Sequence, residues 1–293
     1  FTKMLGGRVP AGARIVAQDD DVVVLQNLPA AEAPLPVLEE RPSGRTLSPG
    51  ETDWRLLHPP AGNSAATVDV VVFLHGIMTG RERFQKSAAG LAAELPPRSA
   101  GVAFTYGFLW KPKDRATDAA ADPRQGRVMV QLRQFLRRLR AERPARRITI
   151  VAYSEGTVIV VGALCGRDDE PAARGADAGP LADDVFLLGS CLAGTEAVAD
   201  LADVPRERYG RLYNLFSEKD GTVEWAHLLR RSPAAGRKGF DADALRRAGL
   251  TERVRNVDCS AFVDCHAAWG PWPGRPWLSR ETMRRVLREM NTA

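Results

Sequence analysis

The sequence predicts an α/β fold in which a mostly parallel central sheet carries helices on both faces. The first observation is that runs of β-branched residues alternate with amphipathic helical patterns from about residue 68 to residue 290. Parallel strands need such helical crossovers, and largely apolar strands are typical of sheets buried on both faces. The second is that the 293 residues are 44% hydrophobic and 26% charged, near the globular average, so the chain can bury a sizeable core.

Residues 1–66 are predicted to form an N-terminal antiparallel β hairpin and an extended connector. Two short β-like stretches, 13–17 and 22–26, flank a run of turn-forming aspartates. Residues 29–50 are rich in Pro, Glu and Ala, which favours an extended chain. A short edge strand is expected near residues 54–57.

Residues 67–293 are predicted to form the α/β domain. Strands are expected at 68–74, 102–106, 148–153, 184–188, 212–216 and 254–257. Helices are expected at 85–95, 128–139, 157–165, 222–230 and 279–290. Two segments, 166–180 and 231–251, interrupt the alternation, and we expect surface loops there, either of which could lie over a site.

The charge balance argues against nucleic acid as a partner, because the net charge is only +5 and is spread over the whole chain. The densest basic cluster follows a helical pattern. We interpret it as the solvated outer face of a helix, with a patch for anionic lipid or phosphate head groups as the alternative, so peripheral membrane contact stays open. Its members are Arg133, Arg137, Arg138, Arg140, Arg143, Arg146 and Arg147.

Cysteine spacing and hydropathy indicate neither a metal site nor a membrane span. No apolar run approaches the ~18–20 residues that cross a bilayer. No basic segment followed by an apolar run marks a signal peptide, so we expect a soluble protein and favour the cytoplasm. The four cysteines lack the C-x-x-C spacing of zinc ligands. Cys259 and Cys265 could bridge a local loop, but unpaired thiols explain them equally well.

The most informative segment is 148–156, I-T-I-V-A-Y-S-E-G, which an apolar helical pattern follows at once. It predicts a strand, a sharp turn at Ser154 and a helix. Such a turn exposes the hydroxyl at the carboxyl end of the strand and requires small residues on either side, here Ala152 and Gly156. The usual pattern is G-x-S-x-G, from which Ala152 departs. We predict that Ser154 is a nucleophile and not merely a helix-capping serine.

The segment 71–80, V-V-F-L-H-G-I-M-T-G, predicts a buried strand that runs into a loop. In a site of this kind, one backbone N–H for an oxyanion comes from the residue after the serine, Glu155, and a second comes from such a loop. We expect the second donor to be Ile77, with Met78 as the neighbouring alternative. His75 itself is expected to be structural.

Chain order selects the base. A nucleophilic serine needs a base and an orienting acid, which in this architecture follow it in the order Ser, acid, His. Of the four histidines, His58 and His75 precede Ser154. His227 comes too soon after the candidate acid to leave room for a further strand, whereas His266 follows a strand-like segment in a loop. We therefore predict His266 as the base.

The acid is predicted at the end of the segment L-Y-N-L-F-S-E-K-D-G, an apolar strand followed by a turn. Asp220 lies just past the carboxyl end of that strand. Glu218 is the near alternative, because a shift of two residues keeps a carboxylate on the same side. Asp258 and Asp264 are as readily explained as turn residues.

Large apolar side chains flank the predicted acid and base. They are Trp225, Leu228, Leu229, Trp269, Trp272 and Trp277. They could line an acyl pocket, but we favour packing of the last helix onto the sheet, because tryptophans supply a large buried area wherever they fall.

In this order the segments resemble the α/β-hydrolase superfamily of serine esterases and lipases, from about residue 68 to the C-terminus. More narrowly, V-F-L-L-G-S, R-L-Y-N-L-F-S-E-K-D and R-N-V-D-C-S followed by His266 are similar to a group that includes transmembrane and coiled-coil domain hydrolases. The resemblance implies a catalytic triad of Ser154, Asp220 and His266 and an esterase-like or lipase-like activity. Ala152 and Cys265 depart from the group, and membrane anchoring is not implied because no spanning segment is present.

The sequence therefore predicts a serine hydrolase that cleaves carboxylic esters, lipid esters among them, through an acyl-enzyme on Ser154. This chemistry requires neither a metal nor an organic cofactor. The expected partner is a small-molecule or lipid ester. Two alternatives stay open: an acyltransferase that uses the same triad, and a non-catalytic binding module built on the same fold.

Overall fold

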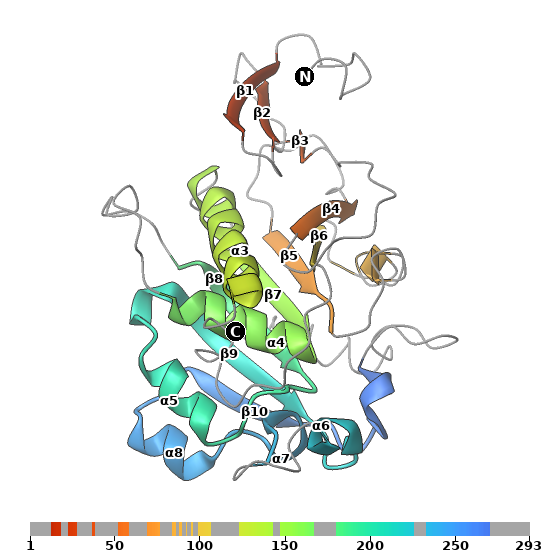
Figure 1. Ribbon diagram of the computed structural model, residues 1–293, viewed down its shortest axis with the longest axis vertical. Coiled ribbons are helices and arrows are strands. Elements are labelled where there is room, and N and C mark those ends of the chain that lie inside the picture. The colour runs from red at the N-terminus through yellow and green to blue at the C-terminus, as the bar shows by residue number, and fades with distance from the viewer. Residues whose placement is uncertain are drawn as a thin grey trace.

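A computed structural model gives the fold (Figure 1). It describes residues 13–18, 23–27, 37–38, 52–58, 69–76, 84–85, 88–89, 92, 95, 99–106, 123–142, 147–166, 180–225 and 233–269, and before residue 69 it describes the strands alone.

A seven-stranded sheet forms the centre of the described chain. In chain order its strands are β4 (Thr52–His58), β5 (Asp69–Leu74), β6 (Ser99–Tyr106), β7 (Ile148–Tyr153), β8 (Ala182–Leu188), β9 (Tyr209–Phe216) and β10 (Val254–Asp258). In space they lie in the order β10-β9-β8-β7-β5-β6-β4. All neighbouring pairs are parallel except β4 and β6, which are antiparallel. The predicted mostly parallel sheet is confirmed.

The N-terminal strands form a second sheet. Its three strands are β1 (Ala13–Gln18), β2 (Val23–Asn27) and β3 (Val37–Leu38). β1 and β2 pair in antiparallel register, as in the expected hairpin. The edge strand expected near 54–57 is β4, which belongs to the central sheet although it lies within residues 1–66. The division of the chain into 1–66 and 67–293 stays a prediction.

Helices cover both faces of the central sheet. α3 (Pro123–Glu142) and α4 (Glu155–Cys165) lie side by side over one face (Figure 1), on a core that includes Leu74 of β5. The preceding residue Phe73 points to the opposite face and packs in a second core with the helical residue Phe84. Because successive strand residues face opposite sides, strands buried on both faces are continuously apolar.

Shorter helices connect the later strands. They are α5 (Glu196–Ala202), α6 (Gly221–Trp225), α7 (Ala235–Lys238) and α8 (Ala242–Arg247), with 3-10 turns η2 (Arg206–Arg208) and η3 (His266–Ala268). No described helix is both long and apolar enough to cross a membrane. The helix expected at 279–290 lies outside the described residues.

The expectation of a surface loop at 231–251 is wrong, because its described part contains α7 and α8. Ala235 and Phe240 are buried in the core, and the side chain of Asp241 caps the N-terminus of α8 by accepting from the backbone N–H of Ala244. The other expected loop, 166–180, lies outside the described residues except at its two ends.

The arginine cluster is not simply a solvated helix face. Arg133 and Arg140 of α3 are buried, and Arg133 Nε donates to a backbone carbonyl near the end of α4. Arg140 pairs with Asp183 at 2.7 Å and Arg147 with Asp184 at 2.6 Å. The interpretation is wrong for these members because the long arginine stem lets the guanidinium reach a carboxylate or a helix-end carbonyl inside the protein.

Candidate active site

The strand order reverses between β7 and β5, and in open α/β sheets ligands bind outside the carboxyl ends of the strands at such a point. From β7 the chain continues through β8, β9 and β10 on one side of the sheet, and from β5 to β6 on the other. Ser154 directly follows β7, and His75 directly follows β5. Asp220 and His266 lie beyond the carboxyl ends of β9 and β10, on the same edge.

Ser154 has a strained backbone. Its φ is 54° and its ψ is −122°, and it is the only non-glycine residue of the described chain with a positive φ. The turn is held by the N–H of Ser154, which donates to the carbonyl of Leu188 at 3.0 Å. The hydroxyl of Thr157 donates to the carbonyl of Ser154 at 2.6 Å. The strand, the turn and the helix expected at 148–165 are all present.

Two glycines let the loop after β5 lie directly against this turn. A Cβ on Gly156 would come within 2.6 Å of the carbonyl oxygen of His75. A Cβ on Gly76 would come within 2.7 Å of the Cβ of Ser154. Neither approach leaves space for a side chain. The small residue expected at 152 is buried in the core.

A continuous chain of hydrogen bonds joins the three residues that the sequence selected. The Nε2 atom of His266 is 3.0 Å from the Oγ of Ser154, and its Nδ1 is 2.8 Å from Oδ2 of Asp220. All three side chains are buried. The carboxylate of Asp220 accepts from Nδ1–H, which leaves Nε2 free to accept from the serine hydroxyl. The alternative acid, Glu218, is exposed and pairs with Lys238 at 2.9 Å.

No family model and no curated protein matches the sequence. Among solved structures, the apo form of esterase 2 from the planctomycete Thermogutta terrifontis matches with a TM-score of 0.52 at 16% identity, over 88% of this chain and 97% of that one. The esterase PE8 matches with a TM-score of 0.50 at 14% identity, over 85% of this chain and 99% of that one.

The chain has the α/β-hydrolase fold. The fold that the resemblance implies is therefore confirmed. The narrower likeness to the group with transmembrane and coiled-coil domain hydrolases stays a prediction.

In this α/β-hydrolase fold, Glu155 is the first residue of α4, so its backbone N–H has no acceptor within the helix. This backbone N–H is one of the two that the sequence predicts to donate to an oxyanion. The predicted second donor, Ile77, and its alternative, Met78, lie outside the described residues. The loop that leads to them ends, in the described chain, at Gly76, which contacts Ser154.

The side chain of Glu155 is a feature that the sequence analysis missed. It is buried, and burial raises the pKa of its carboxyl to about 8, so that it is neutral at pH 7. The side-chain amide of Gln125 donates to Oε1 of Glu155 at 3.2 Å. Within the described residues, Oε2 of Glu155 and Oε1 of Gln125 have no hydrogen-bond partner. A neutral carboxyl places no negative charge next to a backbone N–H that could stabilise an oxyanion.

His75 holds the loop after β5 against β6, as expected of a structural histidine. Its Nδ1 donates to the carbonyl of Gly76 at 2.8 Å, and its Nε2 accepts from the backbone N–H of Tyr106 at 3.1 Å. The hydroxyl of Tyr106 donates to the carbonyl of His75 at 2.7 Å, and the two rings stack. Burial lowers the pKa of His75 to about 4. The buried ring is therefore neutral, with Nδ1 donating one hydrogen bond and Nε2 accepting the other.

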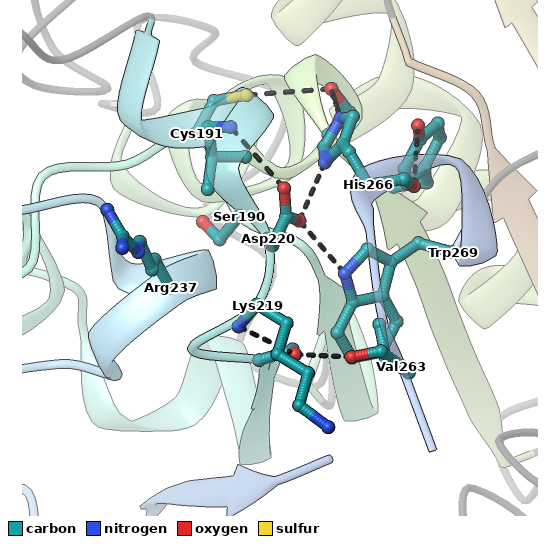
Figure 2. Close-up of polar contacts among 12 residues, drawn as sticks. Ser190, Cys191, Lys219, Asp220, Arg237, Val263, His266 and Trp269 are labelled. Carbon is teal, nitrogen blue, oxygen red and sulfur yellow. Dashed lines mark hydrogen bonds and ion pairs between the residues drawn. The ribbon is translucent and has the colours of Figure 1, made fainter. Parts of the chain in front are cut away.

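Trp269 and Cys191 are further residues whose place the sequence did not indicate. Trp269 is fully buried, and its indole N–H donates to Oδ2 of Asp220 at 3.0 Å (Figure 2). Trp269 belongs to the second core. Packing of the last helix onto the sheet stays a prediction, because that helix, Leu228, Leu229, Trp272, Trp277 and the side chain of Trp225 lie outside the described part of the chain. A tryptophan three residues after a predicted base is the signal that could have found it, since a helical turn brings such residues together.

Cys191 follows β8, and its Sγ is 3.5 Å from the Oγ of Ser154. None of the four cysteines forms a disulfide, so no bridge joins Cys259 and Cys265. Among the described residues, no cluster of three or more His, Cys, Asp or Glu side chains is arranged to hold a metal ion.

Proposed function

We propose that the protein is a serine hydrolase that cleaves carboxylic esters through an acyl-enzyme on Ser154. The observation that carries the proposal is the hydrogen-bonded chain from Ser154 through His266 to Asp220, with distances of 3.0 and 2.8 Å. A nucleophile, a base within reach of it and an acid that orients the base are the parts that acyl transfer needs. Their position at the point where the strand order reverses supports the same conclusion.

In the first half of the reaction, Ser154 Oγ attacks the ester carbonyl carbon while Nε2 of His266 takes the hydroxyl proton. The carbonyl oxygen becomes an oxyanion that accepts from the backbone N–H of Glu155 and from that of Ile77, the predicted second donor. The carbon–oxygen bond to the alcohol then breaks, and the leaving oxygen receives the proton from Nε2. The products are an alcohol and an acyl group bound to Ser154.

In the second half, a water molecule gives a proton to Nε2 of His266 and attacks the acyl carbon. The new oxyanion uses the same two N–H donors. When it collapses, Ser154 Oγ leaves and recovers its proton from the histidine, and a carboxylic acid is released. Asp220 keeps the imidazole in the tautomer with Nδ1–H and stabilises the cation that forms in each half.

Carboxylic esters are the substrate class that these observations favour. The two structural neighbours carry the name esterase, which supports an ester without specifying its acyl chain or alcohol. The arginine cluster gives little support to a lipid surface, because Arg133, Arg140 and Arg147 contact groups within the protein. We therefore propose small-molecule esters first, with a lipase-like activity as the narrower possibility to test.

The test compares Ser154→Ala with the wild-type protein in hydrolysis of p-nitrophenyl butyrate and in labelling by a fluorophosphonate probe. We expect kcat to fall on the order of 10⁴–10⁶-fold and labelling to be lost, with the fold retained. Ser190→Ala is the matched control, because Ser190 is a buried serine whose hydroxyl donates to Thr157. It should still be labelled, and the adduct should map to Ser154.

A folded Ser154→Ala protein that still hydrolyses the ester would reject Ser154 as the nucleophile. Adding a primary alcohol to the wild-type assay separates hydrolysis from acyl transfer. Mostly free acid is the expected product, whereas mostly transferred ester would favour the acyltransferase alternative.

A further inference from the structure

Trp269 contacts the carboxylate that orients the histidine. Its indole Nε1 is 3.0 Å from Oδ2 of Asp220, and the same oxygen is 2.8 Å from Nδ1 of His266. Figure 2 shows the carboxylate between the two rings. Neither Asp220 nor Trp269 has exposed surface, so water does not replace the indole N–H as a donor to the carboxylate.

The local backbone is built for this contact. Trp269 follows the 3-10 turn η3, and its N–H donates to the carbonyl of His266 at 3.1 Å, so a single turn carries the two rings. Opposite them lies Gly189, which has a φ of 51°. A Cβ on Gly189 would be 2.7 Å from Cδ1 of Trp269 and 3.0 Å from Oδ2 of Asp220. The loop after β8 therefore leaves space that the indole and the carboxylate fill together.

A buried carboxylate needs donors to remain charged, because burial removes its hydration. The other oxygen of Asp220, Oδ1, accepts from the backbone N–H of Val223 at a longer 3.4 Å. The cationic ends of Lys219 and Arg237 point away from the carboxylate in Figure 2. The two short contacts are those of His266 and Trp269, and hydrogen bonds to a charged acceptor are the strong ones.

We propose that Trp269 is a positioning residue whose indole N–H keeps the Asp220 carboxylate ionised and turned so that Oδ2 faces Nδ1 of His266. This inference rests on the proposed function, since it assigns the acid and the base their roles. The oxygen shares its charge between two donors. The aspartate therefore orients the imidazole without binding its extra proton so tightly that the proton cannot pass to the leaving alcohol.

The test is Trp269→Phe, which removes the N–H and keeps an aromatic ring in the core. We expect kcat for p-nitrophenyl butyrate to fall about tenfold with little change in KM, because the hydrogen bond to the charged group is lost. We also expect the acid limb of the kcat/KM profile to move to higher pH. With one donor removed, the pair formed by Asp220 and His266 binds a proton more tightly, whichever of the two carries it.

Tyr153→Phe is the matched control. The Tyr153 hydroxyl donates to the backbone carbonyl of His266 at 3.3 Å, and its ring centroid is 4.9 Å from that of the imidazole. The control removes a buried hydrogen bond to the same histidine without touching the carboxylate, so its acid limb should stay in place. If Trp269→Phe lowers kcat but leaves the acid limb where the wild type has it, the indole only packs and the proposal is wrong.

A second measurement needs neither turnover nor a folded variant. In wild-type protein labelled with ¹⁵N-tryptophan, one indole N–H should exchange slowly with solvent, and its shift should change with pH together with the ring signals of His266. An N–H that ignores the histidine titration would overturn the proposal even if Trp269→Phe did not fold. Because no substrate is involved, this result stands apart from whether Ser154 is the nucleophile.

Discussion

Two buried side chains beside Ser154 are neutral at pH 7, because burial disfavours the charge of each. Burial raises the pKa of Glu155 to about 8 and lowers that of His75 to about 4. Glu155 follows Ser154 directly, and the carbonyl of His75 lies against Gly156. Neither Glu155 nor His75 therefore places a charge next to the serine. The electric field at the serine comes from the backbone N–H groups and from the pair of Asp220 and His266.

The state of Glu155 predicts how stability depends on pH. Between its ordinary value of 4.5 and about 8, the unfolded chain has lost a proton that the folded protein keeps, so the free energy of unfolding falls as the pH rises. Glu155→Gln cannot ionise and should not show this fall. In thermal unfolding from pH 5 to pH 8.5, the Tm of the variant relative to wild type should increase toward pH 8. Parallel curves would mean that Glu155 is already ionised in the folded protein.

At the scale of the elements, the turn that carries Asp220 is bonded both to the loop that carries His266 and to the helix α7. The hydroxyl of Ser217, in the turn that carries Asp220, donates to the carbonyl of Val263 at 2.6 Å, in the loop that carries His266. The N–H of Cys259 donates to the carbonyl of Phe216 at 2.8 Å. On the other side of the acid turn, the N–H of Ser217 donates to the carbonyl of Gly236 in α7. These bonds hold the acid and the base in register independently of any substrate.

The close approach of the β5 loop to the serine turn predicts the effect of adding a single methyl group. Gly156→Ala would bring a Cβ within 2.6 Å of the carbonyl of His75, so the loop or the turn must move. We expect a loss of about 1–3 kcal/mol in the free energy of unfolding, as for overpacked cores, and much slower fluorophosphonate labelling of Ser154. Denaturant unfolding and the labelling rate measure the two effects.

Gly221→Ala is the control for that substitution, because a Cβ there meets nothing within 4 Å. Gly221 begins α6, where alanine should be neutral or stabilising by up to about 1 kcal/mol. If both variants were equally stable and equally reactive, the two loops would not need the contact that the glycines allow.

The strands of the central sheet and the long helices could be predicted from the sequence, while the short helices α7 and α8 could not. The strands of the central sheet and the helices α3 and α4 carry apolar patterns long enough to give a clear period. α7 has four residues and α8 has six, too few for a pattern, so residues 231–251 were interpreted as a loop. The motif around Ser154, the place of Asp220 after an apolar strand and the chain order of His266 were enough to select these three residues. The hydrogen bond from Trp269 to Asp220 and the burial of Glu155 depend on contacts between distant segments. The spacing of residues along the sequence does not reveal such contacts.

At the scale of the whole molecule, the opposite end of the sheet is fixed by buried charge. Asp184, near the start of β8, has no exposed surface. It pairs with Arg147, just before β7, at 2.6 Å and with Arg211 of β9 at 3.3 Å. One carboxylate thereby joins three neighbouring strands at their amino ends, far from the carboxyl edge where the candidate site lies.

This arrangement predicts a loss of stability that is separable from activity. Asp184→Asn leaves two cations without their partner and should lower the free energy of unfolding by about 1.5–3 kcal/mol, limited by the partial exposure of both arginines. Urea unfolding measures this, and kcat of the folded variant should stay close to wild type. Asp243→Asn, which removes an exposed pair with Arg246, should change neither. A large fall in kcat for Asp184→Asn would mean that the two edges are coupled.

The order of the site residues along the chain determines when the site can form during synthesis. His266 is 112 residues later than Ser154 and 46 residues later than Asp220. At the usual pace of translation, roughly 5–20 residues per second, the ribosome needs about 6–22 seconds to add the histidine after the serine. A nascent chain in that interval contains the serine but no His266 to activate it. On the proposed mechanism, a product whose translation stops before His266 is therefore inert toward esters.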